Sequence, residues 1–140
     1  MAGKVKGPKP GAGFIIVKKE KKVTKILALV THQGNYDLPK GALDSIDNSF
    51  LECAKRECEE ECSIKIKNKD LLRHIPIISS GRLVLFVAST NQIPKIKKNP
   101  QSGILEHASY EWVTPSLFKS KTSKYLEEAI KEFENYTFMI

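Results

Sequence analysis

The first third of the chain contains two nearly continuous apolar runs. Residues 11–18 (GAGFIIVK) and 23–30 (VTKILALV) lie on either side of three charged residues at 20–22. Short apolar runs bounded by turn residues are typical of buried strands. We therefore predict a hairpin with its turn at 20–22. The preceding residues 1–10 are rich in lysine, glycine and proline and are predicted to form a basic arm.

Strand-like patterns also occupy the second half of the chain. Two apolar segments, 73–78 and 82–88, flank the sequence SSG at 79–81. A turn sequence between two such runs indicates a second hairpin. Together, the pattern predicts strands at 63–67, 73–78, 82–88 and 110–113, and polar loops at 31–37 and 90–103.

Two stretches have the spacing of helices instead. Ser49 followed three residues later by Glu52 is a capping box, which marks the start of a helix. A second helix is predicted at 122–135, where apolar side chains recur every three or four positions. Its predicted apolar face consists of Leu126, Ala129, Ile130 and Phe133. The order of these elements predicts an α/β fold in which a mixed sheet lies between helices.

The first predicted helix carries a high density of acidic residues. Glu57 precedes Glu60 and Glu61 by three and four positions, so the three carboxylates project from nearly the same side. Like charges at this spacing destabilise a helix, whereas a divalent cation would coordinate them, because Mg²⁺ prefers hard oxygen ligands. Just upstream, Lys40 and Gly41 place a cation and a permissive backbone in the loop that enters the helix. A solvated acidic helix is the alternative interpretation.

The stretch from residue 38 to residue 64 resembles the signature of Nudix hydrolases. The resemblance rests on Gly41, Arg56, Glu57, Cys58, Glu60, Glu61 and Ile64, which stand at near-family spacing. Three departures concern Asp47, which stands where the pattern has a glutamate, the one extra residue between Asp47 and Arg56, and Ser63, which replaces the final glycine. These departures affect the hydrogen bonding of the loop and the exit of the helix, and they leave the carboxylates intact. The joint presence of the motif residues disfavours the solvated-helix interpretation.

The resemblance implies an α/β/α sandwich with a mixed β-sheet and two main helices. It also implies a hydrolase of phosphoric anhydrides that uses Mg²⁺ or Mn²⁺. By the same resemblance, Glu57 and Glu61 are the expected metal ligands, and Glu60 is either a further ligand or the base that activates water. Arg56 is expected to hold a motif carboxylate through a bidentate contact.

The resemblance extends to residues outside the carboxylate cluster. Lys40 and Gly41 in the loop, Lys9 in the arm and Arg82 at the start of a strand are predicted to bind the substrate. Glu106 lies where many Nudix enzymes keep an additional metal-binding or basic glutamate, so it is a second candidate for the catalytic base. An exposed loop glutamate is the alternative for Glu106.

Composition and charge describe the setting in which this chemistry would operate. The chain has 140 residues and a formal net charge of +7, and this length suits a single domain over residues 1–140. No apolar run is long enough to cross a membrane and no signal peptide is evident, so we predict a cytoplasmic monomer, with the nucleus left open. The three cysteines are predicted to be free thiols that serve packing.

The basic charge implies an anionic partner. Because the lysines are scattered and no basic helix appears, a polyphosphate small molecule is favoured over nucleic acid. Two branches of the Nudix family resemble the chain: the diphosphoinositol polyphosphate phosphohydrolases, which also tend to cleave diadenosine polyphosphates, and the asymmetrical diadenosine tetraphosphate hydrolases. The net charge favours the first branch. The alternatives are the second branch, an RNA-cap hydrolase and a non-catalytic polyphosphate-binding module.

Overall fold

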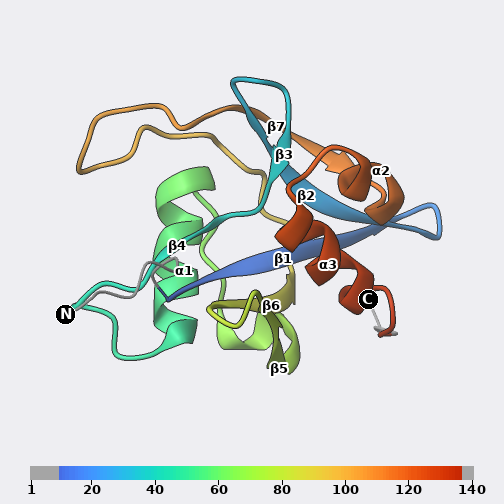
Figure 1. The fold of residues 1–140 in the computed structure, drawn as a ribbon, viewed down its shortest axis with the longest axis horizontal. Helices are drawn as coiled ribbons and strands as arrows, with labels where there is room; N and C mark the ends of the chain where they lie inside the picture. The colour runs from blue at the N-terminus through green and yellow to red at the C-terminus, as the bar shows by residue number, and fades with distance from the viewer. Residues whose placement is uncertain (1–9, 137–140) are drawn as a thin grey trace.

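The computed structural model describes residues 10–136, and its ribbon is shown in Figure 1. In chain order the elements are β1 (Gly11–Glu20), β2 (Val23–Thr31), β3 (Tyr36–Asp37), β4 (Lys40–Ala42), α1 (Phe50–Cys62), the 3₁₀ turn η1 (Asn68–Asp70), β5 (Leu71–Ser79), β6 (Leu83–Ser89), β7 (His107–Val113), α2 (Pro115–Ser120) and α3 (Lys124–Phe133). Within this described part of the chain, no helix is long and apolar enough to cross a membrane.

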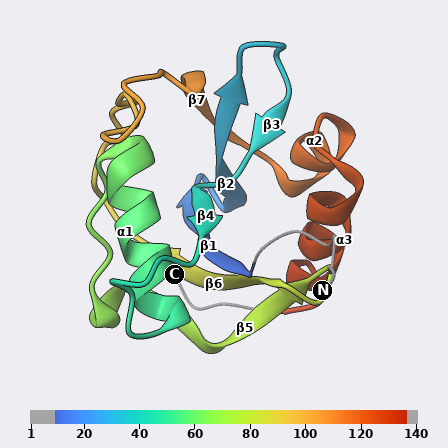
Figure 2. The same cartoon turned by 60° about the vertical axis from the view of Figure 1, so that its left-hand side comes forward.

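The strands form one mixed sheet that is covered on both faces. Its main path runs β3-β2-β1-β6-β5, while β4 pairs with β1 and β7 pairs with β2. The pairing of β1 with β6 is parallel, and the other pairings are antiparallel. Figure 2 shows α1 on one side of the sheet and α2 and α3 on the other. The predicted α/β/α sandwich with a mixed sheet is therefore confirmed.

The central position of β1 in the sheet explains why its sequence is almost continuously apolar. Phe14 and Ile16 belong to the core under α1, whereas Ile15 and Val17 belong to the core under α3, and all four are fully buried. A strand that is covered on both faces needs apolar residues at every position. The three cysteines are free and buried in the core under α1, as their predicted packing role requires.

The ends of α1 follow the capping signals with two adjustments. The Ser49 hydroxyl accepts the backbone N–H of Glu52 at 3.1 Å, as predicted. The Glu52 carboxylate, however, accepts the N–H of Asn48 at 3.3 Å rather than that of Ser49. At the other end Ser63 adopts a left-handed conformation with φ of 64°, and its N–H donates to the carbonyl of Glu59. The serine thus provides the helix exit for which the family pattern uses glycine.

The prediction of a strand at 63–67 is wrong. Ile64 and Ile66 are buried, as the alternation suggests, but no strand within residues 10–136 pairs with this segment. The Gln92 side chain instead accepts the N–H of Lys65 at 2.9 Å and donates to its carbonyl at 2.8 Å. A side-chain amide thereby satisfies the backbone groups that a strand partner would otherwise have satisfied.

Element boundaries differ from the prediction near the C-terminus and in two loops. The short helix α2 was not predicted, although Thr114 caps it by accepting the N–H of Leu117 at 3.2 Å and Pro115 occupies its first turn. Helix α3 spans Lys124–Phe133 and is therefore shorter than the helix predicted at 122–135. The four apolar residues predicted for its buried face are buried. In addition, β3 begins inside the predicted loop at 31–37, and β7 begins three residues earlier than predicted.

Candidate metal and phosphate site

Strand β4 and helix α1 meet at the N-terminal end of β1. Ala12 of β1 pairs with Gly41 of β4, and α1 packs across β1. A Cβ atom at Gly41 would overlap the carboxylate of Glu57. Any larger residue at position 41 would therefore displace the Glu57 carboxylate from its present place.

Arg56 links the loop before α1 to the carboxylates on the helix. Its Nε and Nη2 atoms donate to the two carboxylate oxygens of Asp47 at 2.9 and 2.8 Å. Its Nη1 donates to Glu57 at 3.1 Å and to Glu60 at 3.4 Å. The Asp47 side chain is only 3% exposed, and its hydrogen bonds from Arg56 lower its pKa to about 2. Asp47 thus fills the place of the family's first glutamate, and the longer loop still delivers a bidentate contact.

This contact predicts a loss of stability when Asp47 is replaced by asparagine. The variant loses the charge that pairs with Arg56, so we expect the free energy of unfolding at pH 7 to fall by about 2 kcal/mol, the scale of a charge-assisted hydrogen bond. Because folding lowers the pKa of Asp47, the stabilisation is complete above its ordinary value near 4 and is lost as pH falls through 2. Urea unfolding of both proteins between pH 2 and pH 7 measures the difference.

The matched control is Asp70→Asn, because the Asp70 carboxylate accepts a backbone hydrogen bond from Lys67 at an exposed site. We expect this variant to lose less than half as much stability as Asp47→Asn. Equal losses at pH 7, or a loss for Asp47→Asn that persists unchanged at pH 2, would contradict the role of the Asp47 carboxylate.

Glu61 is more deeply buried than Glu57 on the same helix. Its Oε1 accepts the backbone N–H of Lys40 at 3.2 Å. Burial, assisted by the charges of Glu57 and Asp37, raises the pKa of Glu61 to about 9. Burial also raises the pKa of Glu57, and the charges of Glu60 and Glu106 act in the same direction. Burial is the main cause for both groups, so these two carboxylates ionise less readily than an exposed glutamate.

Glu106 lies beside the motif carboxylates although it is distant in sequence. A small cavity is lined by Glu60, Glu61, Lys97, Asn99, Glu106 and His107. The Asn99 side-chain amide donates to Glu106 at 2.8 Å. The neighbouring His107 is 5% exposed, and its Nε2 lies 3.1 Å from the Asp37 carboxylate. Glu106 is thus adjacent to the α1 carboxylates, whereas His107 is a satisfied, buried histidine.

The donor set at this site fits a divalent cation. Glu57, Glu60 and Glu61 would hold the ion through hard carboxylate oxygens, and Glu106 is a further donor. Among residues 10–136, no three acidic, histidine or cysteine side chains are already grouped as metal ligands. Arg56 engages Glu57 and Glu60, and the Lys40 N–H engages Glu61, so these carboxylates currently face protein partners.

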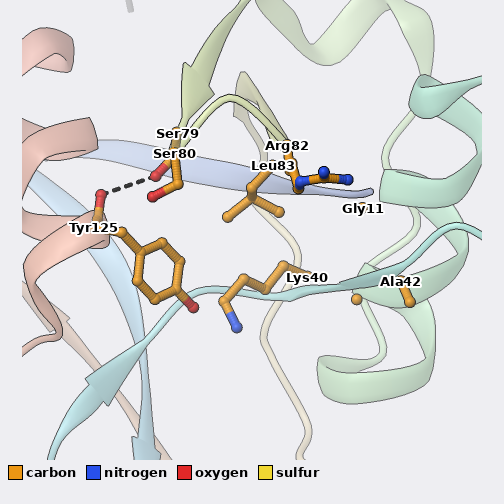
Figure 3. A pocket seen from close by; sticks show the side chains of 9 residues that line it. Gly11, Lys40, Ala42, Ser79, Ser80, Arg82, Leu83 and Tyr125 are labelled. Atoms are coloured by element: carbon orange, nitrogen blue, oxygen red, sulfur yellow. Dashed lines mark hydrogen bonds between the residues drawn. The ribbon is translucent and has the colours of Figure 1, made fainter. Parts of the chain in front are cut away.

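A pocket of about 360 Å³, shown in Figure 3, includes Gly41, the residue that lies against the Glu57 carboxylate. It is lined by Gly11, Lys40, Gly41, Ala42, Ser79, Ser80, Arg82, Leu83 and Tyr125. Three of the four predicted substrate residues, Lys40, Gly41 and Arg82, therefore line one pocket, and the fourth, Lys9, lies outside the described residues. In Figure 3 Lys40 extends from β4 and Arg82 from the turn between β5 and β6.

Sequence reasoning did not identify two residues of this region, Tyr125 and Asp37. Tyr125 lines this pocket and also a second pocket of about 350 Å³, which shares Lys40 with the first. The signal for Tyr125 was an aromatic residue outside the apolar face of a predicted helix. Asp37 lies 3.1 Å from Lys40 Nζ; although burial opposes a charged ammonium, Asp37 and Tyr125 raise the pKa of Lys40. No sequence signal marks Asp37, because its other partner is 70 residues away.

The geometry is that of a carboxylate cluster beside a basic pocket, and comparison with known proteins agrees with it. The family profile of the NUDIX domain matches residues 7–133. The chain belongs to the NUDIX domain family. As a Nudix hydrolase it acts on phosphoric anhydrides, and Nudix hydrolases generally use divalent metal ions. A search of curated proteins found no match.

Solved structures share the fold at low sequence identity. A C. elegans Ap4A hydrolase in a binary complex is 17% identical with a TM-score of 0.65, covering 89% of this chain and 94% of that one. The NUDIX domain of Shewanella oneidensis NrtR, complexed with ADP ribose, is 16% identical with a TM-score of 0.66, covering 95% and 91%. A MutT protein from Methanosarcina mazei is 19% identical with a TM-score of 0.65, covering 94% and 97%. At these identities the similarity shows the fold of this Nudix hydrolase.

Proposed function

We propose that this Nudix hydrolase uses Mg²⁺ or Mn²⁺ to cleave a phosphoanhydride bond in a small polyphosphate, with diphosphoinositol polyphosphates and diadenosine polyphosphates as its substrates. One observation carries the proposal: Gly41 lines the basic pocket and at the same time lies against the Glu57 carboxylate. A phosphate chain held in the pocket would therefore lie next to the carboxylate cluster. A cytoplasmic location and a monomeric state are part of the same proposal.

Each charged residue of the site has a role in this proposal. Glu57 and Glu61 would hold the ion, with Glu60 as a further ligand, and the ion would supply positive charge beside the reacting phosphoryl group. Arg56 keeps Glu57 and Glu60 oriented through the hydrogen bonds of its Nη1. Glu60 or Glu106 accepts the proton of the attacking water.

The basic residues of the pocket support the diphosphoinositol substrate. Lys40 lies in β4 and Arg82 in the turn between β5 and β6, so the two cations reach the pocket from different elements. A compact ring that carries phosphates on all sides requires donors arranged in this way. Lys9 in the N-terminal arm is proposed as a third cation that binds this substrate, in addition to Lys40 and Arg82.

One observation favours asymmetrical diadenosine tetraphosphate hydrolysis as the second candidate. Tyr125 is 37% exposed and lines both of the neighbouring pockets. A dinucleoside substrate carries its charge in one chain and offers adenines that stack on an aromatic ring. An RNA-cap hydrolase and a non-catalytic binding module remain as lesser alternatives.

Arg82→Ala separates the two substrates. We expect kcat/KM for a diphosphoinositol polyphosphate to fall roughly tenfold, as for the loss of one charge-assisted hydrogen bond. The value for diadenosine tetraphosphate is expected to change less than threefold, because stacking contributes more to its binding. Side-by-side steady-state kinetics on both substrates measure the difference.

Lys69→Ala is the matched control, because it removes one positive charge from an exposed residue that does not line the pocket. We expect it to leave both kcat/KM values within about twofold, since a distant exposed charge is largely screened. If wild type prefers the dinucleotide by orders of magnitude and Arg82→Ala affects neither substrate, the inositol assignment is wrong and the second candidate replaces it.

A further inference from the structure

The turn between β1 and β2 concentrates positive charge away from the candidate site. Residues 18–25 contain five lysines and a single acidic residue, Glu20, and we call this segment the lysine hairpin. Gly11, at the site end of β1, is nine residues from Glu20, a distance of about 30 Å along an extended strand. In Figure 1 the hairpin projects on the side opposite α1. Its charge is therefore too remote to bind a small substrate at the carboxylates.

The backbone at the tip of the lysine hairpin favours residues other than lysine. Glu20 pairs with Val23, which leaves Lys21 and Lys22 as a two-residue turn with φ of 49° and 67°. A turn with two left-handed residues prefers Asn-Gly, because other side chains are disfavoured in this region. Stability alone would thus select Asn-Gly at these two positions. Lys21 and Lys22 therefore make the turn less stable than Asn-Gly would.

The lysines of the hairpin fall into two groups. Lys18 and Lys25 face each other across the strands and contact Glu20 at 3.0 and 3.3 Å, and Lys18 Nζ lies 4.4 Å from the centre of the Trp112 ring. These two ammonium groups are held in place. The other three, Lys19, Lys21 and Lys22, are exposed, and within residues 10–136 no carboxylate lies within ion-pair distance of them.

We propose that the lysine hairpin binds the phosphate backbone of single-stranded nucleic acid. Successive residues of a strand point to opposite faces, so Lys18 and Lys19 place cations on both faces of the ribbon while Lys21 and Lys22 occupy its tip. A flexible strand of phosphates follows both faces of such a ribbon, whereas a flat membrane surface meets only its tip. Of the residues in the hairpin, Val23 is the one exposed apolar side chain, which is too little for insertion into lipid.

The inference is independent of the proposed substrate and has its own test. The double variant Lys21→Asn/Lys22→Gly installs the residues that the turn prefers and removes two charges. We expect its melting temperature to rise and its affinity for a labelled single-stranded 20-mer RNA to fall roughly 25-fold at 0.1 M salt. The slope of log K against log salt is expected to become shallower by about 1.4, because each lost phosphate contact contributes about 0.7. Fluorescence anisotropy and thermal unfolding supply the measurements.

The control Lys65→Asn/Lys69→Asn removes the same charge from two exposed lysines beyond the C-terminal end of α1. We expect it to reduce RNA affinity less than threefold. Equal losses in the two double variants would show diffuse attraction to the whole surface and overturn the proposal. The proposal also fails if the hairpin variant keeps its RNA affinity but loses binding to phosphatidylserine vesicles, because the partner would then be a membrane. A melting temperature that falls would refute the argument from the turn.

Discussion

Glu61→Gln is expected to reduce kcat for phosphoanhydride hydrolysis roughly 10³-fold, the scale seen when one preorganised electrostatic contact is removed from a catalytic site. Glutamine keeps the shape of the side chain and can still accept the Lys40 N–H that now lies 3.2 Å from Glu61. It removes the negative charge that a divalent cation requires of its ligand. Steady-state rates at saturating substrate and Mg²⁺ measure the effect.

The fold is expected to tolerate this change. Because burial raises the pKa of Glu61 to about 9, this side chain is already neutral at pH 7 without the ion, so glutamine leaves its charge unchanged and unfolding in a chelator should need about as much urea as for wild type. Glu59→Gln is the matched control, because Glu59 lies on the same helix with 47% of its side chain exposed. It is expected to keep activity within about twofold. Equal activity in Glu61→Gln and Glu59→Gln would remove Glu61 from the metal site.

Gly41→Ala is expected to lower kcat/KM roughly 10²-fold, the loss that follows when a catalytic group is displaced by about 1 Å. The added methyl group would overlap the Glu57 carboxylate, so either β4 or Glu57 must shift. Because Gly41 also lines the basic pocket, both the carboxylate and the bound phosphate would be misplaced. Kinetics as a function of Mg²⁺ concentration should show a weaker apparent affinity for the metal.

Gly81→Ala controls for the general effect of replacing a glycine. Gly81 has a φ of 70°, and no heavy atom of the described residues lies within 4 Å of the position of a Cβ, so alanine there costs stability without touching the site. We expect its kcat/KM at 25 °C to stay within about threefold of wild type. If Gly41→Ala retains wild-type activity and metal dependence, the close approach of β4 to Glu57 has no role in catalysis.

Patterns within a short stretch of sequence predicted most of the fold. The buried strands β1 and β2, the helix that carries the carboxylates and the apolar face of α3 all follow from local periodicity and capping. The alternation at 63–67 was misleading, because burial of every second residue does not require a strand partner. The backbone of this segment is hydrogen-bonded by the Gln92 side chain, which is too distant in sequence for a local pattern to reveal.

The candidate site was predictable where its residues belong to one motif and not where they meet by tertiary folding. Glu57, Glu60 and Glu61 lie on a single helix, whereas the contact of Asp37 with Lys40 and the position of Tyr125 depend on packing. Net charge was a poor guide to the substrate. Five lysines of the chain lie on the lysine hairpin, so the case for a diphosphoinositol substrate rests on the pocket rather than on the charge of +7.

The most direct test of the central claim follows the phosphorus atoms of the substrate. Wild type and Glu61→Gln are each incubated with a diphosphoinositol polyphosphate and Mg²⁺ and monitored by ³¹P NMR. With wild type, the diphosphate signals should give way to inorganic phosphate and a monophosphate ester, and a chelator should stop the change; with Glu61→Gln they should persist. Tight binding by wild type without any conversion of this substrate or of diadenosine tetraphosphate, with either Mg²⁺ or Mn²⁺, would contradict metal-dependent hydrolysis at this site.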